Sequence, residues 1–256
     1  MIIANSISYK AGAKEILHST SVSMQPGTFN VIMGANGAGK STLLKLLAGS
    51  IQPVSGSIQL GDKKITEYSN QQLARKRAVL SQHYSIGFPI TVEEVVMMGR
   101  YPYFSVKPSA SDTAICHKTM EQMQVSGFAQ RDYNTLSGGE AQKVQMSRVL
   151  AQIDGANKEN ILFLDEPVSH LDIKYQHQLL QTAKDCCQQG TTVIAVLHDI
   201  NLSLYYADRI FFMKQGRIIH DSTNSRSITV DIIKEVFDIN VTIIEHPSQA
   251  RPVIIP

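Results

Sequence analysis

The sequence predicts an α/β fold with a parallel sheet, an antiparallel β piece and an inserted α-helical subdomain. Three short runs at 29–33, 161–164 and 193–197 are wholly apolar, as parallel strands covered on both faces are. A strand-like run ending in Gly-Asp at 57–62 indicates an antiparallel hairpin. Residues 86–152 carry helical patterns and no convincing strand, which predicts a helical insertion into the core.

The other elements follow from local patterns along the chain. A capping box at Thr91–Glu94 opens a helix that stops near Gly99 and Pro102, and Pro26-Gly27 closes the strand expected over 16–24. Further strands are expected over 2–9, 16–24 and 79–81, helices over 42–48, 70–77, 91–99, 111–124, 175–188 and 229–237, and a hairpin from 210–213 and 217–219.

These elements predict a single domain of 256 residues in three parts. We expect residues 1–85 and 153–220 to form the core together with the antiparallel β piece. Residues 86–152 would be the helical subdomain, and 221–256 would be a C-terminal helix and tail.

Composition limits the classes of function. The net charge of +2 and the lack of a basic tail argue against a nucleic-acid-coating protein. The chain shows no basic leader and no apolar stretch near the ~20 residues that cross a bilayer, so we expect it in the cytoplasm. Cys116, Cys186 and Cys187 lack metal-ligand spacing, and we expect them to be apolar filler.

A phosphate-binding loop pattern, G-x-x-x-x-G-K-[ST], is matched at every fixed position by residues 34–41. The apolar run before it and the helical pattern after it supply the strand-loop-helix context that this motif requires. Backbone N–H groups at a helix start bind anions, and Lys40 adds a full charge for the outer phosphates. Ser41 is the expected magnesium ligand. An ordinary glycine-rich turn is the alternative.

Acidic residues and a histidine follow two of the apolar runs. Asp165 and Glu166 come directly after 161–164, and His198 comes directly after 193–197. Because ligands bind beyond the carboxyl ends of parallel strands, these ends are expected to share one site with the phosphate loop. We assign magnesium binding to Asp165 and activation of the attacking water to Glu166. His198 would contact the γ-phosphate and this water, although a lone histidine is more often structural.

A second anion site is predicted at Leu136-Ser137-Gly138-Gly139-Glu140. Ser137 and Glu140 have capping-box spacing, and two glycines leave the helix start open to a phosphate. A simple helix cap is the alternative.

The ordered set of motifs resembles the ATP-binding subunits of ABC transporters. Residues 161–166 match the family's Walker B strand, 136–140 its signature, 169–172 its D-loop and His198 its switch histidine. Gln82 matches the Q-loop, which implies a catalytic role and a magnesium contact, and Tyr9 matches the aromatic residue that stacks on adenine. The Walker A loop implies ATP binding by Gly34, Ala35, Asn36, Gly37, Ala38, Gly39, Lys40, Ser41 and Thr42.

The resemblance also implies partners. It implies a head-to-tail homodimer that encloses two ATP molecules with Mg²⁺, in which Ser137, Gly138, Gly139 and Glu140 of one copy meet the nucleotide of the other. Glu140 and His170 depart from residues frequent in the family, glutamine and alanine. Segments 88–103 and 245–256 resemble the importers of iron chelates, cobalamin and haem, most nearly those of haem.

Such a subunit is expected on the cytoplasmic face of the inner membrane. Its implied partners are two copies of a multi-span permease and a periplasmic haem-binding protein that acts through the permease. Nucleic acid is not an expected partner. A siderophore or cobalamin importer is the main alternative. A soluble ABC ATPase is less favoured because the chain has one cassette and no heptad tract, and a small-molecule kinase leaves 136–140 unexplained.

Overall fold

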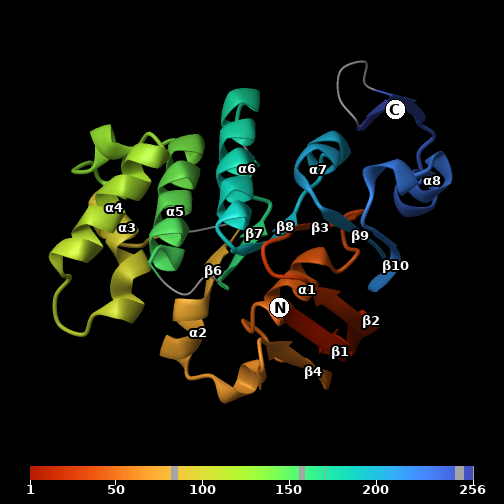
Figure 1. Ribbon diagram of the computed structural model, residues 1–256, viewed down its shortest axis with the longest axis horizontal. Coiled ribbons are helices and arrows are strands. Elements are labelled where there is room, and N and C mark those ends of the chain that lie inside the picture. Colours follow the sequence, from red (N-terminus) through yellow and green to blue (C-terminus); the bar gives the residue numbers. More distant parts are fainter. Residues whose placement is uncertain (82–85, 156–158, 170, 246–250, 256) are drawn as a thin grey trace.

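The computed structural model of the protein describes residues 1–81, 86–155, 159–169, 171–245 and 251–255. A central sheet separates two sets of elements, as Figure 1 shows. An antiparallel sheet and helix α1 lie on one side, and α5, α6 and α7 lie on the other. The predicted fold class is confirmed.

The central sheet has the strand order β10-β9-β3-β8-β7-β6 in the described part of the chain. Five of these strands run parallel, and β10 pairs antiparallel with β9 at one edge. Their bounds are β3 Phe29–Gly34, β6 Arg77–Leu80, β7 Ile161–Asp165, β8 Thr192–Val196, β9 Arg209–Lys214 and β10 Arg217–Ser222. Every residue of β3, β7 and β8 is buried, as their unbroken hydrophobic runs predict.

The second sheet is antiparallel, with the order β2-β1-β4-β5. Its strands are β1 Ile2–Ala11, β2 Lys14–Met24, β4 Ser55–Leu60 and β5 Lys63–Lys64. Its apolar side chains form one core with the leucines of α1 and with Ile32, Phe163 and Val196 of the central sheet. This core fixes the start of α1 against the end of β3.

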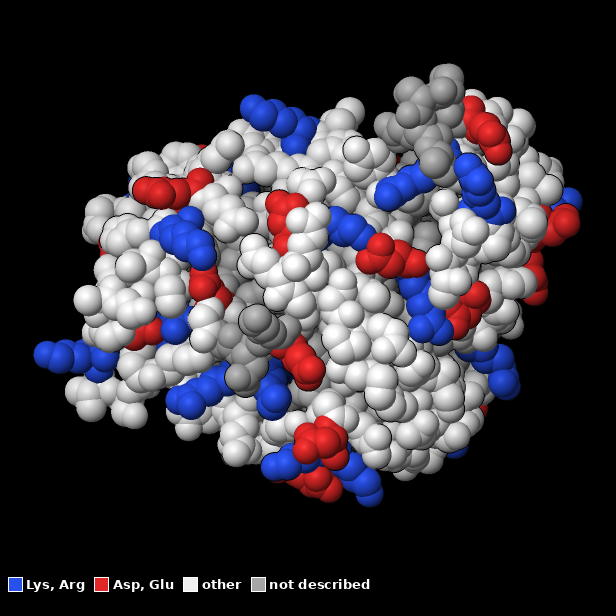
Figure 2. All heavy atoms as spheres, viewed as in Figure 1, with Lys and Arg blue, Asp and Glu red and all other residues white. Residues whose placement is uncertain are grey.

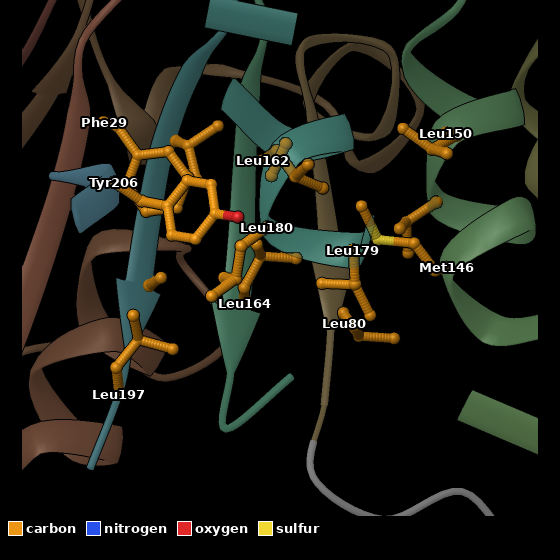
Figure 3. Close-up of a cluster of buried hydrophobic side chains, with 14 of the residues drawn as sticks. Phe29, Leu80, Met146, Leu150, Leu162, Leu164, Leu179, Leu180, Leu197 and Tyr206 are labelled. Atoms are coloured by element: carbon orange, nitrogen blue, oxygen red, sulfur yellow. The ribbon is translucent and has the colours of Figure 1, made fainter. Parts of the chain in front are cut away.

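Helices cover the other face of the central sheet. Successive side chains of a strand point to opposite faces, so Leu162 and Leu164 face these helices while Phe163 faces α1. Figure 3 shows Met146 and Leu150 of α5 close to Leu179 of α6 within this core. The helices are α1 Lys40–Leu47, α2 Asn70–Lys76, α3 Val92–Met97, α4 Ala110–Gln122, α5 Gly138–Ile153, α6 Ile173–Gln188, α7 Ile200–Tyr206 and α8 Val230–Phe237.

The helices α3, α4 and α5 stand together at one end of the molecule (Figure 1). A buried ion pair joins Arg100 to Asp112 at 2.9 Å, and Arg100 also donates to the carbonyls of Ala151 and Asp154. These contacts tie the end of α5 to α4. Short 3₁₀ turns lie at Ile65–Glu67, Met98–Tyr103, Ser126–Phe128, Tyr133–Thr135 and Ser225–Ser227.

Two features were not predicted. The first is helix α7, and the second is a hairpin of β11 (Thr242–Glu245) and β12 (Pro252–Ile255) in the segment expected to be a plain tail. Asn201 of α7 donates to the carbonyl of Ile254 and accepts from its N–H. The C-terminal hairpin is therefore docked on the core.

Candidate nucleotide-binding site

The phosphate-loop candidate lies between the end of β3 and the start of α1. Gly34 has φ 152°, and a Cβ atom there would lie 2.2 Å from the carbonyl oxygen of Met213, so only glycine fits. Gly39 has φ 97° at the N-cap of α1, and among the described residues no side chain caps this helix start. Ala35, Asn36 and Gly37 are exposed. The loop therefore presents open backbone at the positive end of a helix.

Lys40 folds back over this loop. Its Nζ donates to the carbonyl oxygens of Gly34 at 2.9 Å and Ala35 at 3.0 Å. Burial lowers the pKa of Lys40, and the nearby carboxylates of Glu166 and Asp165 oppose that shift. The ammonium group is thus held inside the loop, where a phosphate would satisfy its charge.

Ser41 and Asp165 meet beside the loop. Ser41 Oγ donates to Asp165 Oδ1 at 2.9 Å. Burial raises the pKa of Asp165, and the hydrogen bond from Ser41 opposes this rise. Hydroxyl and carboxylate oxygens suit Mg²⁺, which usually takes one or two protein ligands and completes its shell with phosphate and water. The described residues hold no cluster of three or more His, Cys, Asp and Glu side chains that could bind a metal.

Glu166 and His198 also meet at this edge of the sheet. The Asp165 position of β7 is paired with Val196 of β8, which brings the two strand ends together. Glu166 has a left-handed φ of 52°, and its N–H donates to the carbonyl of Val196. His198 Nε2 lies 2.7 Å from Glu166 Oε1. Three strand ends thus place Lys40, Asp165, Glu166 and His198 around one site.

The signature candidate forms a separate helix start. Ser137 donates through its N–H and hydroxyl to Glu140 Oε2, at 2.7 and 2.8 Å, and its hydroxyl accepts from the N–H of Glu140. Ser137 and Gly138 are exposed. Arg131, which the sequence did not indicate, lies 3.6 Å from Glu140 Oε1. Helix α5 stands with α3 and α4, whereas α1 lies with the antiparallel sheet (Figure 1), so the two anion sites belong to different parts of the chain.

The remaining predicted residues are placed as follows. Tyr9 is half-buried in β1 beside the α1 core, and Thr42 lies in the first turn of α1. Gln82 and His170 lie outside the described residues. Gly216 was not foreseen as part of the loop's support. Its N–H donates to the carbonyl of Ala38 at 3.0 Å, and the glycine of a tight hairpin is the only sequence signal for it.

Comparison with known proteins agrees with this geometry. Residues 17–169 match the family model described as ABC transporter. The chain belongs to the ABC transporter family. Family membership implies nucleotide binding, which the loop around Lys40 accommodates.

Several curated ABC relatives match over nearly the full chain and are named hemin import ATP-binding protein HmuV. The one from Rhodopseudomonas palustris (strain BisB5) is 38% identical, with 100% of this chain and 97% of that protein covered. The one from Bordetella avium (strain 197N) is 39% identical, covering 98% and 97%. The one from Hahella chejuensis is 39% identical, covering 99% of each.

Solved structures of ABC proteins share the fold. A putative metal-chelate type ABC transporter in an inward-facing conformation gives a TM-score of 0.82 at 22% identity, covering 100% of this chain and 96% of that one. A dimeric bacterial ABC transporter cassette gives 0.76 at 25% identity, covering 87% and 98%. In the described part of this ABC chain, no helix is both long and apolar enough to span a bilayer.

Proposed function

We propose that the chain is the ATP-hydrolysing subunit of an ABC importer that powers haem uptake across the inner membrane. One observation carries the ATPase assignment: three adjacent strand ends bring a phosphate loop, a buried carboxylate, a second carboxylate and a histidine to one edge of the sheet. The relatives named for hemin import support haem as the cargo.

The chain's own residues divide the work at this edge. The loop from Gly34 to Thr42, which exposes Ala35, Asn36 and Gly37 and includes Lys40, holds the triphosphate, and Tyr9 stacks on the base. Ser41 and Asp165, with Gln82, would hold Mg²⁺, which would offset negative charge on the phosphates. Glu166 accepts a proton from the attacking water, and His198, 2.7 Å from it, orients that carboxylate and contacts the γ-phosphate.

The signature acts on the nucleotide of a second copy. The hydroxyl of Ser137 and the N–H groups of Gly138 and Gly139 stand at an exposed helix start, which favours an anion from outside the subunit. Two copies arranged head to tail would enclose two ATP molecules, with Glu140 at the edge of each contact. The dimeric cassette of similar fold supports this arrangement.

The ATP-hydrolysing dimer acts through membrane partners. We place the dimer on the cytoplasmic face of the inner membrane, bound to two copies of a multi-span permease. A periplasmic haem-binding protein delivers cargo to that permease. We propose the boundaries 86 and 152 for the helical subdomain that meets the permease, while residues 221–256 extend the core.

Reconstitution tests the proposal. The subunit and its permease, placed in vesicles with the haem-binding protein, should hydrolyse ATP several-fold faster when haem is loaded. A ferric siderophore and cobalamin serve as matched cargo controls and should not stimulate. Stimulation by either of these instead of haem would reassign the cargo. An ATP hydrolysis rate that does not change when the permease and the loaded binding protein are present would contradict the importer role.

A further inference from the structure

Helix α5 contacts the chain immediately after Glu166. Gln142 Nε2 donates to the carbonyl oxygen of Pro167 at 2.8 Å. Gln142 lies in the second turn of the helix that Ser137 caps, and Pro167 is the residue next to Glu166. One hydrogen bond therefore links the signature helix to the peptide that follows the proposed base.

A second contact lies one residue further along α5. Lys143 is buried, and its Nζ stands 3.0 Å from the centre of the Tyr175 ring in the first turn of α6. Asp172 caps α6 by accepting from the N–H of Tyr175 at 3.0 Å. Lys143 therefore fixes the helix that begins where the connection from β7 ends. A desolvated cation over an aromatic face is a favourable contact.

Glu166 needs such support. Its φ of 52° is a left-handed conformation that side-chain-bearing residues rarely adopt, and such strain persists only where neighbouring contacts maintain it. The N–H of Glu166 is held by Val196 from within the sheet. On its other side, the Pro167 carbonyl is held by Gln142.

Both contacts join the signature helix α5 to the chain that follows β7, and we propose that these two parts serve different nucleotides. Ser137 faces the nucleotide of the second copy, whereas Glu166 serves the nucleotide of its own loop. The residues that line a cavity of about 360 Å³ include Ser137, Glu140, Lys143, Asp172 and Tyr175, so the signature and the start of α6 share one surface.

We infer that Gln142 and Lys143 are positioning residues that tie the signature helix to Glu166. When Ser137 binds the nucleotide of the second copy, this link positions the Glu166 carboxylate at the subunit's own nucleotide. The inference rests on the proposed ATPase function. It assigns no contact with substrate to either residue. Their loss should slow the chemical step while leaving ATP binding to the isolated subunit unchanged, because the loop around Lys40 is not involved.

The test compares removal with conservative replacement. Gln142→Leu, Lys143→Met and Tyr175→Leu should each lower kcat about tenfold, while the ATP dissociation constant of the isolated subunit stays within about twofold. Lys143→Arg and Tyr175→Phe keep a cation and a ring and should recover most of kcat. The Hill coefficient for ATP should fall only in the first set.

Gln178 offers a matched control. Gln178 lies in α6, and its Nε2 donates to the main-chain carbonyl of Gln122 in α4 at 3.3 Å. Like Gln142, it is a glutamine that bonds to a main-chain carbonyl, but it does so away from Glu166. Gln178→Leu should leave kcat unchanged. Equal losses in Gln178→Leu and Gln142→Leu, or no recovery in Lys143→Arg, would show general stabilisation and overturn the inference.

Two outcomes separate this inference from the proposed function. If Gln142→Leu is folded by circular dichroism and fully active while Glu166→Gln is inactive, only the positioning role fails. If Glu166→Gln retains full turnover, the proposed base is wrong. Should Gln142→Leu not fold, the Lys143 and Tyr175 pairs decide the question alone.

Discussion

Glu166 Oε1 and His198 Nε2 lie 2.7 Å apart, although the two residues follow different strands and are 32 positions apart in the sequence. The parallel pairing of β7 with β8 makes this contact possible. His198 thereby fixes the orientation of the carboxylate that we assign to the attacking water. Positioning of this kind contributes to rate through the transition state and only weakly to substrate affinity.

His198→Ala should therefore lower kcat about a hundredfold with little change in KM for ATP, since Glu166 loses the contact with His198 that orients its carboxylate. Steady-state hydrolysis measures both values. His177→Phe is the control, because His177 bonds to Tyr206 outside the site. An unchanged kcat in His198→Ala would remove the histidine from the mechanism.

Lys40→Met should separate affinity from stability. The ammonium is buried, so an apolar chain of similar length should change the free energy of unfolding by no more than about 1 kcal/mol. ATP affinity should fall about a hundredfold, because charge-assisted hydrogen bonds to phosphate are lost. Calorimetry and urea unfolding check the two values. Lys63→Met, at an exposed position of β5, should change neither.

Glu140→Gln should strengthen the contact between two copies. Hydrogen bonds from the backbone and hydroxyl of Ser137 lower the pKa of Glu140, so it is charged at neutral pH and repels a nearby triphosphate. Arg131, 3.6 Å away, partly offsets that charge. Sedimentation with ATP should show a tighter dimer for Glu140→Gln and a weaker one for Arg131→Gln. The opposite order would place the nucleotide away from this helix start.

Asp112→Asn tests the buried pair in the helical part. Burial disfavours the charged form, but hydrogen bonds from Ser109 and Arg100 outweigh it and hold the pKa of Asp112 below the ordinary 3.8. The stabilisation is thus present above the ordinary pKa and is lost as pH falls through the lower folded value. At pH 7 the variant should lose about 3 kcal/mol of unfolding free energy, because Arg100 stays buried without its partner.

The difference between wild type and Asp112→Asn should shrink below about pH 4, following that sign. Urea unfolding at pH 7 and pH 3 measures it. Asp62→Asn, at an exposed position, provides the baseline. A difference that does not depend on pH would mean that Asp112 acts through packing rather than charge.

Elements with a long uniform pattern or a strong cap were predictable from sequence. The buried strands β3, β7 and β8 and strand β9 were expected within one residue, whereas β10, expected to end at 219, continues to Ser222. Helix α6 begins at Ile173 rather than at the expected Tyr175 because Asp172 caps it. Helix α7 has only seven residues, too few for a reliable helical period, although Asp199 is a recognisable cap.

The C-terminal hairpin was missed for a different reason. β11 and β12 have four residues each, and short apolar runs do not distinguish a strand from a loop. Their stability depends on docking against α7 through Asn201. That contact is not visible in local sequence.

Much of the site could be predicted because its residues follow strands in a phosphate-loop context. The partners of those residues could not. Three such contacts depend on how helices pack. They are the hydrogen bond of Lys40 to its own loop, the ion pair of Arg131 with Glu140 and the hydrogen bond from Gln142 to Pro167. No spacing rule encodes such packing. The binding and catalytic roles of all the site residues, Gln82 and Tyr9 included, stay predictions.

The most direct test of the proposed nucleotide-enclosing dimer is the mass of Glu166→Gln in solution with Mg²⁺ and ATP, measured by light scattering. We predict a doubling from the 28.3 kDa subunit, with two ATP molecules retained and turnover nearly abolished, and no dimer when Ser137→Arg is added. A sample that stays monomeric beside its permease, or one that hydrolyses ATP at the wild-type rate, would contradict this prediction.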